Sequence, residues 1–491
     1  MPITFLDGSV EDELAFDFRE IFPEECGLFF GFGIGDASFN GIRALRAQEP
    51  RGERGCGIIS FDGKDFYRRS RVGKVSVQFA NFDLKKCRHE FPGRVAVGHN
   101  RYATAGKPDA QENVQPFLRH TKWGEIVVAH NGTFVNAASL RQELLAAGRV
   151  LSTTSDTEMF FNLLTLSGEE DLEKAVISAL NKVKAAYSLI IVSRDKCFVA
   201  RDRYGIRPLS LGKLSRGYVA CSETFAIDQI PGAKYWRYVK PGELLVFERA
   251  RAPRSVQYAK PHPRFCIFEA VYFMRPRSRI NGCYVEDFRY ALGMAMAKDI
   301  LGQVRQMGID MVVPVLDSGE YFAKGLAYGL GIEYVEALAR TKNFAENVQD
   351  RSFTAASQEE RIRTILGKHN LRPDLVTGRR PMIADDSIVR ANTSKILVDL
   401  FKKAGAAGVY FAAGYPPIKH PCFNGMDFQT TSELIASAKD IPAIKKRIGV
   451  DWLFYLHEET LVRTAREKFD YGICGACYNG AYPEKPFSPS V

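Results

Sequence analysis

The sequence predicts an α+β layered domain followed by an α/β domain with a parallel sheet. The first prediction rests on many short β-type runs, separated by glycines and a few helical stretches, between residue 26 and about residue 250. The second rests on the alternation of strands and helices from about residue 265 onward, which is typical of a doubly wound sheet. We expect an acidic leader at 1–25, a first domain at 26–260 and a second domain at 261–491.

The first domain is expected to be rich in strands. The strand candidates are apolar or alternating runs at 26–33, 56–61, 95–99, 126–130, 187–193, 218–222 and 243–247. Helices are expected at 137–147 and 157–166, and the leader is expected to be helical over 10–18. The proline-containing stretch 252–263 is predicted to be a linker.

In the second domain strands and helices are expected to alternate. Strands are predicted at 310–315, 334–338, 381–384 and 408–413, and helices at 320–330 and 393–404. In the last helix Ile396, Leu397, Leu400 and Phe401 fall on one face, so we expect that face to pack on the sheet.

The composition is that of a globular chain. The 491 residues are 46% hydrophobic, 12% aromatic and 25% charged, which excludes a disordered, collagen-like or disulfide-dense protein. No apolar run approaches the roughly 18 residues that a membrane span needs. The amino terminus has neither the basic start nor the apolar core of a secretory signal. We therefore expect a cytoplasmic protein that engages no membrane.

The charge is unevenly distributed. The net charge is +10, but the leader carries eight acidic residues against Arg19 alone, so the other 466 residues carry +17. Such a surplus is compatible with nucleic acid or with anionic small molecules. Lysine and arginine are scattered among acidic residues, and the short basic clusters are not interleaved with aromatic residues. A polyanionic metabolite therefore explains the surplus as well as a nucleic acid does.

Cys26 is a candidate nucleophile. It follows Glu24 and Glu25 and opens an apolar strand. If the leader is removed after Glu25, Cys26 carries both a thiol and a free α-amine. An α-amine titrates at about 7.7–8.0 and can accept the thiol proton at neutral pH. For an isolated Cys-Gly pair, a small buried cysteine at the head of a strand is the more common alternative.

Four further stretches carry chemistry that fits this nucleophile. They are RGERGCG at 51–57, GHNRYAT at 98–104, AHNG at 129–132 and SDTE at 155–158. The fork of Arg101 suits a carboxylate, the carboxylate of Asp156 suits an ammonium group, and an amide beside a glycine N–H suits an oxyanion.

In this order the stretches resemble the signatures of class II (N-terminal-nucleophile) glutamine amidotransferases. The resemblance implies that Cys26 attacks glutamine and that Asn131 and Gly132 form the oxyanion hole. It also implies that glutamine is bound by Arg51, Gly52, Arg101, Thr104 and Asp156, with Arg51 and Gly52 positioning the nucleophile and one end of the substrate. Glu53-Arg54 departs from the Gln and acid that the family usually has there.

A second motif lies in the other domain. The apolar run 381–384 ends in Asp385 and Asp386, and the loop after them opens a helix at Thr393 and Ser394. Acids at the carboxyl end of a strand can hold ribose hydroxyls, and backbone N–H groups at the start of a helix can hold a 5′-phosphate. An acidic turn with a Thr-Ser cap is the common alternative.

With this motif the chain resembles the amidophosphoribosyltransferases over essentially its full length. Supporting stretches lie at 204–209, 220–224, 240–243, 268–276 and 433–436. The resemblance implies an αββα N-terminal-nucleophile glutaminase domain joined to an α/β phosphoribosyltransferase domain. It also implies that phosphoribosyl diphosphate and Mg²⁺ are held by Asp317, Ser318, Lys342, Asp385, Asp386, Ser387, Thr393 and Ser394.

The second motif departs from the family pattern. Ala391 and Asn392 replace the Gly and first Thr of the phosphate loop, and alanine restricts close backbone approach. The segment after Lys342 lacks the Arg-Tyr of the family, Leu366 replaces an arginine, and Arg277 replaces an aspartate. The changes lie around the acceptor site, whereas the glutaminase motifs are nearly intact.

Ten cysteines in a chain without a secretory signal favour metal binding or catalysis over disulfides. Cys474 and Cys477 form a C-x-x-C motif, which alone is compatible with zinc or with two unrelated thiols. The iron–sulfur branch of the family also has cysteines at the positions of Cys266 and Cys422. The resemblance implies a [4Fe–4S] cluster on these four residues, with a Cys₄ zinc site as the alternative. Cys56, Cys87, Cys197, Cys221 and Cys283 are interpreted as core residues.

The resulting hypothesis is a two-site enzyme that releases ammonia from glutamine and adds it to C1 of phosphoribosyl diphosphate. Its expected partners are these substrates and purine nucleotide effectors, without nucleic acid, in a homo-oligomer. One alternative is a diverged paralogue that delivers ammonia to another phosphorylated acceptor. Another is a non-catalytic nucleotide sensor, which four intact glutaminase residues argue against.

Overall fold

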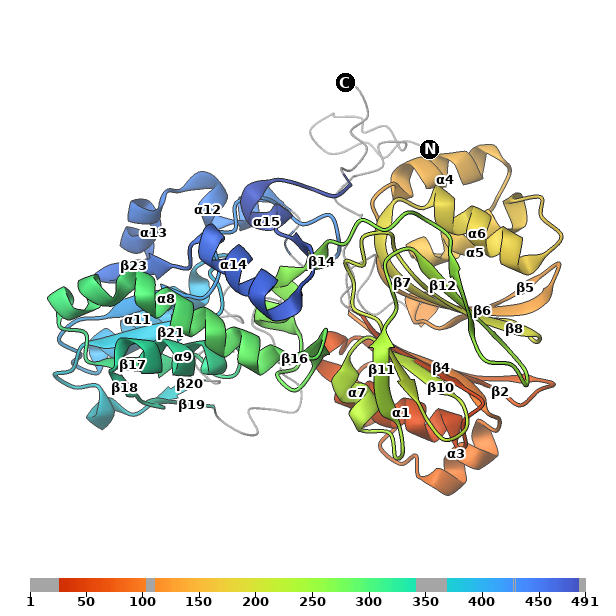
Figure 1. The fold of residues 1–491 in the computed structure, drawn as a ribbon, viewed down its shortest axis with the longest axis horizontal. Helices are drawn as coiled ribbons and strands as arrows, with labels where there is room; N and C mark the ends of the chain where they lie inside the picture. The colour runs from red at the N-terminus through yellow and green to blue at the C-terminus, as the bar shows by residue number, and fades with distance from the viewer. Residues whose placement is uncertain (1–25, 103–110, 341–368, 427, 429, 485–491) are drawn as a thin grey trace, which may run out of the picture.

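The structure is a computed structural model that describes residues 26–102, 111–340, 369–426, 428 and 430–484. The predicted helix in the leader lies outside these residues. The first half of the chain, red to light green in Figure 1, and the second half, green to blue, form two bodies side by side. No helix of the described residues is long and apolar enough to cross a membrane.

Two antiparallel sheets form the centre of the first domain. The seven-stranded sheet has the order β11-β9-β10-β1-β4-β2-β3 and the six-stranded sheet the order β13-β12-β8-β7-β6-β5. The strands of the first sheet are β1 (Gly27–Phe32), β2 (Gly55–Phe61), β3 (Phe66–Val72), β4 (Val95–Arg101), β9 (Ser210–Lys213), β10 (Tyr218–Cys221) and β11 (Lys234–Tyr238). Those of the second are β5 (Phe117–Thr121), β6 (Gly124–Phe134), β7 (Ala185–Val192), β8 (Lys196–Arg201), β12 (Glu243–Glu248) and β13 (Arg254–Gln257).

Helices cover the outer face of each sheet. The first sheet carries α1 (Ala37–Ala47), α2 (Val75–Gln78), α3 (Leu84–Glu90) and α7 (Thr224–Asp228), and the second carries α4 (Ala137–Ala146), α5 (Asp156–Leu166) and α6 (Leu172–Lys182). A third apolar cluster, which includes Phe30, Val97 and Ile190, lies between the sheets. Alternating side chains of each strand thus enter two different cores. The predicted αββα layering is confirmed.

The second domain is built on a five-stranded parallel sheet in the order β18-β17-β21-β22-β23. Its strands are β17 (Met311–Pro314), β18 (Glu333–Tyr334), β21 (Pro381–Asp385), β22 (Tyr410–Ala413) and β23 (Trp452–Tyr455). Val312 and Met382 pack toward α8 (Val285–Met307), α9 (Glu320–Leu330) and α14 (Glu458–Phe469). Met311 and Ile383 pack toward α11 (Asn392–Lys403) and α13 (Ile441–Ile448) on the other face. This arrangement confirms the predicted α/β class.

Short elements connect these layers. Strand β14 (Phe265–Cys266) pairs with β24 (Ile473–Cys474), β15 (Arg279–Ile280) with β16 (Cys283–Tyr284), and β19 (Leu338–Arg340) with β20 (His369–Leu371). The remaining short helices are η2 (Glu49–Arg51), η3 (Gln111–Asn113), η6 (Pro373–Leu375), η7 (Thr431–Glu433), α12 (Ile435–Ala438) and α15 (Ala476–Asn479), and η4 (Glu269–Phe273) is π-helical.

Three expectations about elements were wrong. The predicted linker at 252–263 contains β13, which pairs with β12 and completes the six-stranded sheet. The predicted strand at 334–338 is split, because β18 ends at Tyr334 in the parallel sheet and β19 begins at Leu338 in a separate antiparallel pair. In α11 Leu397 and Phe401 are buried as expected, but Val398 is buried in place of Ile396 and Leu400, which are half-buried.

Candidate active sites

The nucleophile lies at the start of the central strand of the seven-stranded sheet. Cys26 is fully buried and directly precedes β1, whose Gly27 pairs with Asn100 of β4. Its carbonyl oxygen accepts a hydrogen bond from Arg51 Nε at 3.1 Å. The strand that follows Cys26 pairs with β4 from Gly27 and with β10 from Phe29, so both neighbouring strands support the chain just after the nucleophile.

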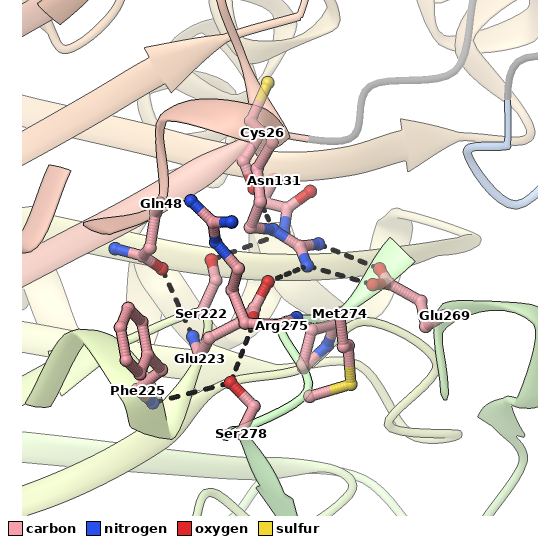
Figure 2. Close-up of polar contacts among 12 residues, drawn as sticks. Cys26, Gln48, Asn131, Ser222, Glu223, Phe225, Glu269, Met274, Arg275 and Ser278 are labelled. Atoms are coloured by element: carbon pink, nitrogen blue, oxygen red, sulfur yellow. Dashed lines mark hydrogen bonds and ion pairs between the residues drawn. The ribbon is translucent and has the colours of Figure 1, made fainter. Parts of the chain in front are cut away.

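Arg51 is bound on its other nitrogens by two carboxylates, those of Glu223 and Glu269, which are labelled in Figure 2. Its Nη1 donates to Glu223 and to Glu269, and its Nη2 to Glu269, each at 2.9 Å. Burial disfavours the charge, but the carboxylates of Glu269 and Glu223 outweigh it and raise the pKa of the guanidinium. Arg51 therefore contacts the nucleophile's backbone, as predicted for its positioning role. Direct contact with glutamine stays a prediction.

The two oxyanion candidates are adjacent in β6. Asn131 Nδ2 lies 3.5 Å from Ser222 Oγ, which also accepts a hydrogen bond from the N–H of Leu28 at 3.0 Å. Figure 2 shows Asn131 beside Cys26. Gly132 has φ +143°, and a Cβ there would lie 1.9 Å from the carbonyl oxygen of Ala186. Only glycine fits this position, because any side chain would collide with the backbone of β7.

Close packing against β4 also requires glycine at position 52. A Cβ at this position would lie 2.6 Å from the carbonyl carbon of Arg101, so the turn after Arg51 packs directly against the end of β4. The Arg101 side chain, predicted to bind the glutamine carboxylate, is 1% exposed. The packing of Gly52 thus fixes the backbone of Arg101, and Thr104 lies outside the described residues.

Asp156, predicted to bind the substrate ammonium, is the first residue of α5. Its Oδ2 accepts a hydrogen bond from the N–H of Phe134 at 3.0 Å, and its Oδ1 lies 3.3 Å from His130 Nδ1. His130 is fully buried, and its carbonyl oxygen lies 3.0 Å from His99 Nε2. Sequence reasoning included His130 in a motif without giving it a role. From its proximity to Asp156 we infer that His130 helps to orient that carboxylate.

The second site lies where β17 and β21, neighbours in the parallel sheet, lead to helices on opposite faces. This is a topological switch point, the usual ligand crevice of an open α/β sheet. The loop after β17 carries Asp317 and Ser318, and Ser318 Oγ donates to Asp385 Oδ1 at 3.5 Å. A Cβ on Gly319 would lie 2.5 Å from the carbonyl oxygen of Ala384, so the two loops are in contact.

Asp385 and Asp386 are both buried at the carboxyl end of β21. The N–H of Asp386 donates to Asp385 Oδ1 at 2.9 Å, and Ser387 Oγ donates to Asp386 Oδ1 at 2.6 Å. Burial raises the pKa of both carboxyls, and the charge of Asp386 raises that of Asp385 further. Two carboxylates held this close favour a ligand that supplies hydroxyl donors or positive charge.

The phosphate-loop candidate keeps a left-handed residue at its end. Ala391 has φ +60° and precedes α11, a helix of 12 residues whose first turn contains Thr393 and Ser394. Ala391 is 5% exposed and packs in the apolar cluster beneath the loop. Ala391 thus adopts a conformation that glycine favours and buries its methyl group, and the expected restriction of close backbone approach to a phosphate stays a prediction.

The remaining residues of the second site are only partly placed. Lys342 and Leu366 lie outside the described residues. Arg277, which replaces an aspartate of the family, is exposed and forms an ion pair with Glu286 at 2.8 Å. Glu286 lies in the first turn of α8, so the positive charge of Arg277 is paired there.

The four cysteines predicted to bind metal lie on β14, β24, α15 and the loop at Cys422. Cys266 and Cys474 are partners in the β14–β24 pair. Cys422 Sγ accepts hydrogen bonds from the N–H groups of Asn424 and Met426, each at 3.4 Å, and Cys477 Sγ lies 3.2 Å from Tyr415 Oη. Burial raises the pKa of the Cys266 thiol, Arg207 opposes this, and the nearby Cys474 and Cys422 thiols add to it.

Metal-binding geometry is not formed by these residues as they stand. Among the described residues, no group of three or more His, Cys, Asp or Glu is arranged to hold a metal ion. Of the cysteines interpreted as core residues, Cys56, Cys87, Cys197 and Cys221 are buried and Cys283 is half-buried.

Sequence reasoning missed the residues that support the nucleophile. Glu223 and Glu269 belong to stretches that resemble the family, but their charges gave no sign that they meet Arg51, 172 and 218 residues away in the chain. The sequence offered only one signal, which is that both glutamates stand in apolar surroundings. It did not show which arginine they bind, because that pairing is made by tertiary contacts.

Known proteins resemble this chain over most of its length. Residues 99–229 match the glutamine amidotransferase domain family. The chain is 36% identical over 473 residues to an amidophosphoribosyltransferase of Bacillus subtilis, covering 95% of this chain and 96% of that protein. It is also 36% identical over 494 residues to the chloroplastic amidophosphoribosyltransferase 2 of Arabidopsis thaliana, covering 100% of this chain and 84% of that protein.

Two solved structures extend this likeness to the fold. One is the glutamine phosphoribosylpyrophosphate amidotransferase from B. subtilis complexed with ADP and GMP, with a TM-score of 0.84 and 35% identity over 95% of this chain and 99% of that one. The other is described as the allosteric regulatory enzyme of purine biosynthesis, with a TM-score of 0.85 and 35% identity over 95% of this chain and 98% of that one. This chain belongs to the amidophosphoribosyltransferase family.

Proposed function

We propose that this chain converts phosphoribosyl diphosphate and glutamine to 5-phosphoribosylamine, glutamate and pyrophosphate, the first step of purine biosynthesis. The observation that carries the proposal is the joint presence of a glutaminase constellation around Cys26 and of a buried acid pair at the β17–β21 switch point. Its full-length relatives support it, since they are named for this reaction.

The first half-reaction takes place at Cys26. After removal of the acidic leader, the α-amine of Cys26 accepts the thiol proton, and the sulfur attacks the carboxamide carbon of glutamine. The N–H of Gly132 and the amide of Asn131 stabilise the oxyanion. Ammonia leaves, a glutamyl thioester remains on Cys26, and water hydrolyses it to glutamate. Arg101 binds the α-carboxylate and Asp156 the α-ammonium group of glutamine.

The second half-reaction takes place at the switch point. Ammonia passes internally between the domains and attacks C1 of the ribose, the bond from C1 to the diphosphate oxygen breaks, and the amine nitrogen loses a proton. Asp385 and Asp386 bind the ribose hydroxyls, and Asp317, Ser318 and Lys342 would hold the diphosphate and its Mg²⁺. Ser387, Thr393, Ser394 and the first turn of α11 bind the 5′-phosphate. Catalysis here is mainly positioning and charge neutralisation.

We propose further that Cys266, Cys422, Cys474 and Cys477 hold a [4Fe–4S] cluster. The chemistry of the residues supports the proposal, because three of the four thiols are buried, Cys422 is half-buried, and two backbone N–H groups donate to Cys422 Sγ. The guanidinium of Arg207 opposes the rise in the pKa of Cys266 and of Cys474, as a positive charge beside a thiolate site should. The cluster would join β14, β24 and the loop at Cys422.

Regulation and assembly are proposed from the relatives. The B. subtilis enzyme was solved with ADP and GMP, so we propose that purine nucleotides are effectors of this chain in a homo-oligomer of the cytoplasm. Ala391, Asn392 and the altered segment after Lys342 keep a second candidate open, a paralogue that delivers ammonia to another phosphorylated acceptor.

The test is a comparison of two nitrogen sources. Wild-type protein and Cys26→Ala are incubated with phosphoribosyl diphosphate and either glutamine or ammonia, and pyrophosphate release is followed. We expect Cys26→Ala to lose glutamine-dependent release and to keep ammonia-dependent release. Loss of both would contradict the two-site scheme, and wild-type protein that releases glutamate but binds no phosphoribosyl diphosphate in calorimetry would favour the paralogue.

A further inference from the structure

The nucleophile and the oxyanion candidates of the glutaminase site come from different sheets. Cys26 precedes β1 of the seven-stranded sheet, whereas Asn131 belongs to β6 of the six-stranded sheet. Their distance therefore depends on how one sheet lies on the other. The layer between the sheets is filled by apolar side chains such as Leu28 and Ala129, whose packing has no preferred direction. Hydrogen bonds are directional, so polar contacts across this layer fix the two strands more closely than apolar packing does.

Ser222 faces this layer from the seven-stranded sheet. It directly follows β10, in which Ala220 packs between the sheets and Cys221 packs toward the outer helices. Because side chains alternate between the two faces of a strand, Ser222 points into the layer between the sheets, where it is fully buried. In β6 the side chain of Ala129 packs in the same layer, so that of Asn131 points into it from the other sheet. Figure 2 shows Ser222 beside Asn131.

The hydroxyl of Ser222 joins the strands of the nucleophile and of the oxyanion hole. Its Oγ accepts a hydrogen bond from the N–H of Leu28, two residues after Cys26, at 3.0 Å and another from Asn131 Nδ2 at 3.5 Å. One oxygen atom thus receives a hydrogen bond from each sheet. Asn131 Oδ1 has no hydrogen-bond partner within the described parts of the chain, so the other end of this amide supplies no such anchor.

Other contacts hold the two strands without the Ser222 hydroxyl. The carbonyl oxygen of Leu28 accepts from the backbone N–H of Ser222 at 3.2 Å and from Gln48 Nε2 at 3.0 Å. In β6 the carbonyl oxygen of His130 lies 3.0 Å from Nε2 of His99 in β4, which is a second polar contact between the sheets. Removal of the hydroxyl should therefore leave the strands in place and release only the amide of the oxyanion hole.

We propose that Ser222 is a positioning residue for the oxyanion hole, which sets the Asn131 amide relative to the nucleophile strand. The inference rests on the proposed function, because that function assigns the oxyanion to Asn131. Negative charge develops on the substrate oxygen only in the transition state, so a donor aimed at it acts after glutamine has bound. The Ser222 hydroxyl therefore affects kcat of the glutamine-dependent reaction and not the glutamine KM.

The test is a double-mutant cycle on glutamine-dependent synthesis. For Asn131→Ala we expect kcat to fall about 100–1,000-fold, the usual effect of losing one oxyanion donor. For Ser222→Ala we expect a fall of about 10–100-fold, because the donor is misplaced but present, with the glutamine KM changed less than about 2-fold. The double variant should match Asn131→Ala within about 2-fold, since Ser222 then has no amide to hold. Ammonia-dependent synthesis should stay at the wild-type rate throughout.

Ser38→Ala is the matched control. Ser38 is buried in α1 on the outer face of the same sheet, and its Oγ donates to the carbonyl oxygen of Phe91 at 2.9 Å. The variant loses a buried hydroxyl contact away from the site, so kcat with glutamine should stay at the wild-type value. Ser222→Cys is a second variant of the tested position, because its thiol keeps the shape of serine but accepts hydrogen bonds weakly. Its kcat should fall in the same way as that of Ser222→Ala.

The outcomes separate the inference from the proposed function. Wild-type protein that releases no glutamate from glutamine, or Asn131→Ala with an unchanged kcat, would contradict the proposed function itself. A normal kcat in Ser222→Ala beside a reduced one in Asn131→Ala would overturn the inference alone. Losses that multiply in the double variant, or equal losses of the glutamine-dependent and ammonia-dependent activities, would also overturn it, because both indicate a general structural role. If Ser222→Ala does not fold, Ser222→Cys is judged by the same criteria.

Discussion

Arg51 Nε donates a hydrogen bond to the carbonyl oxygen of Cys26 at 3.1 Å, so the Arg51 side chain contacts the nucleophile through the backbone of Cys26. A lysine at this position would keep the charge but not the fork that also reaches Glu223 and Glu269. We expect Arg51→Lys to lower kcat for glutamine-dependent synthesis by about 10–100-fold, because small misplacements of a reacting group are costly. Steady-state assays with glutamine and with ammonia would measure this.

Arg237→Lys is the control for that variant, since Arg237 also binds a buried glutamate with two nitrogens. It should leave both activities near the wild-type values. An equal fall of the glutamine and ammonia activities in Arg51→Lys would mean that Arg51 serves general stability only.

His130 is expected to control glutamine binding through Asp156. Its Nδ1 lies 3.3 Å from Asp156 Oδ1 without a hydrogen bond between them, and Asp156 Oδ2 accepts from the N–H of Phe134. We expect His130→Ala to raise the glutamine KM about 5–10-fold with little change in kcat, because the carboxylate loses the buried side chain packed 3.3 Å from its Oδ1 and small misplacements of a binding group are costly. His130→Asn should restore much of the binding, because its amide can donate to the same oxygen. A KM that is equal in both variants would contradict this role.

The methyl group of Ala391 is expected not to change the affinity for the phosphate. Its left-handed conformation costs roughly 1–2 kcal/mol, whereas Ala391→Gly would lose about 0.8 kcal/mol of methyl burial and about 0.5–1 kcal/mol of backbone entropy. These terms nearly cancel, so we expect the free energy of unfolding to change by less than about 1 kcal/mol. The affinity for phosphoribosyl diphosphate should stay the same, because the methyl group lies in the apolar cluster. Calorimetry that shows tenfold tighter binding in Ala391→Gly would mean that the methyl group obstructs the phosphate.

His99 is expected to make the first domain sensitive to acid. Burial lowers the pKa of His99 to about 3, whereas histidine in an unfolded chain titrates at about 6.5. Below pH 6.5 the unfolded chain therefore binds a proton that the folded chain refuses, and stability falls with falling pH by about 1.4 kcal/mol per unit until the folded pKa is reached. Denaturant unfolding at pH 7.5, 6.5 and 5.5 should show a steeper loss for wild-type protein than for His99→Gln. Parallel curves would contradict the assignment.

The cysteine quartet is expected to bind iron and sulfide in equal amounts. Anaerobically purified wild-type protein and Cys283→Ser should both show them, because Cys283 lies outside the quartet. Cys422→Ser should lose them, together with the visible charge-transfer absorption, since it removes one thiolate ligand. Zinc in place of iron in the wild-type protein would show a Cys₄ zinc site instead.

The sequence alone predicted the fold classes, and its short motifs predicted the chemistry of both sites. Strands such as β1, β6 and β21 and the helix α9 were predicted within a few residues, because their periodicity and bounding glycines are local properties. The two aspartates ending β21 and the nucleophile before β1 followed from short motifs for the same reason. The split of the strand at 334–338 did not, because the pairing of β19 with β20 depends on residues 31 positions further on.

The tertiary structure decided how these parts are joined. The meeting of Arg51 with Glu223 and Glu269, and of Arg289 with the carbonyls of Ala270 and Met274, is not encoded in any local spacing. These residues are charged, and from the sequence alone a charged residue is expected at the surface. They are buried because two domains close over them, and only complementary charge at the interface makes that burial tolerable. The chemistry of each site was therefore readable in the chain, whereas the buried contacts that support it required the fold.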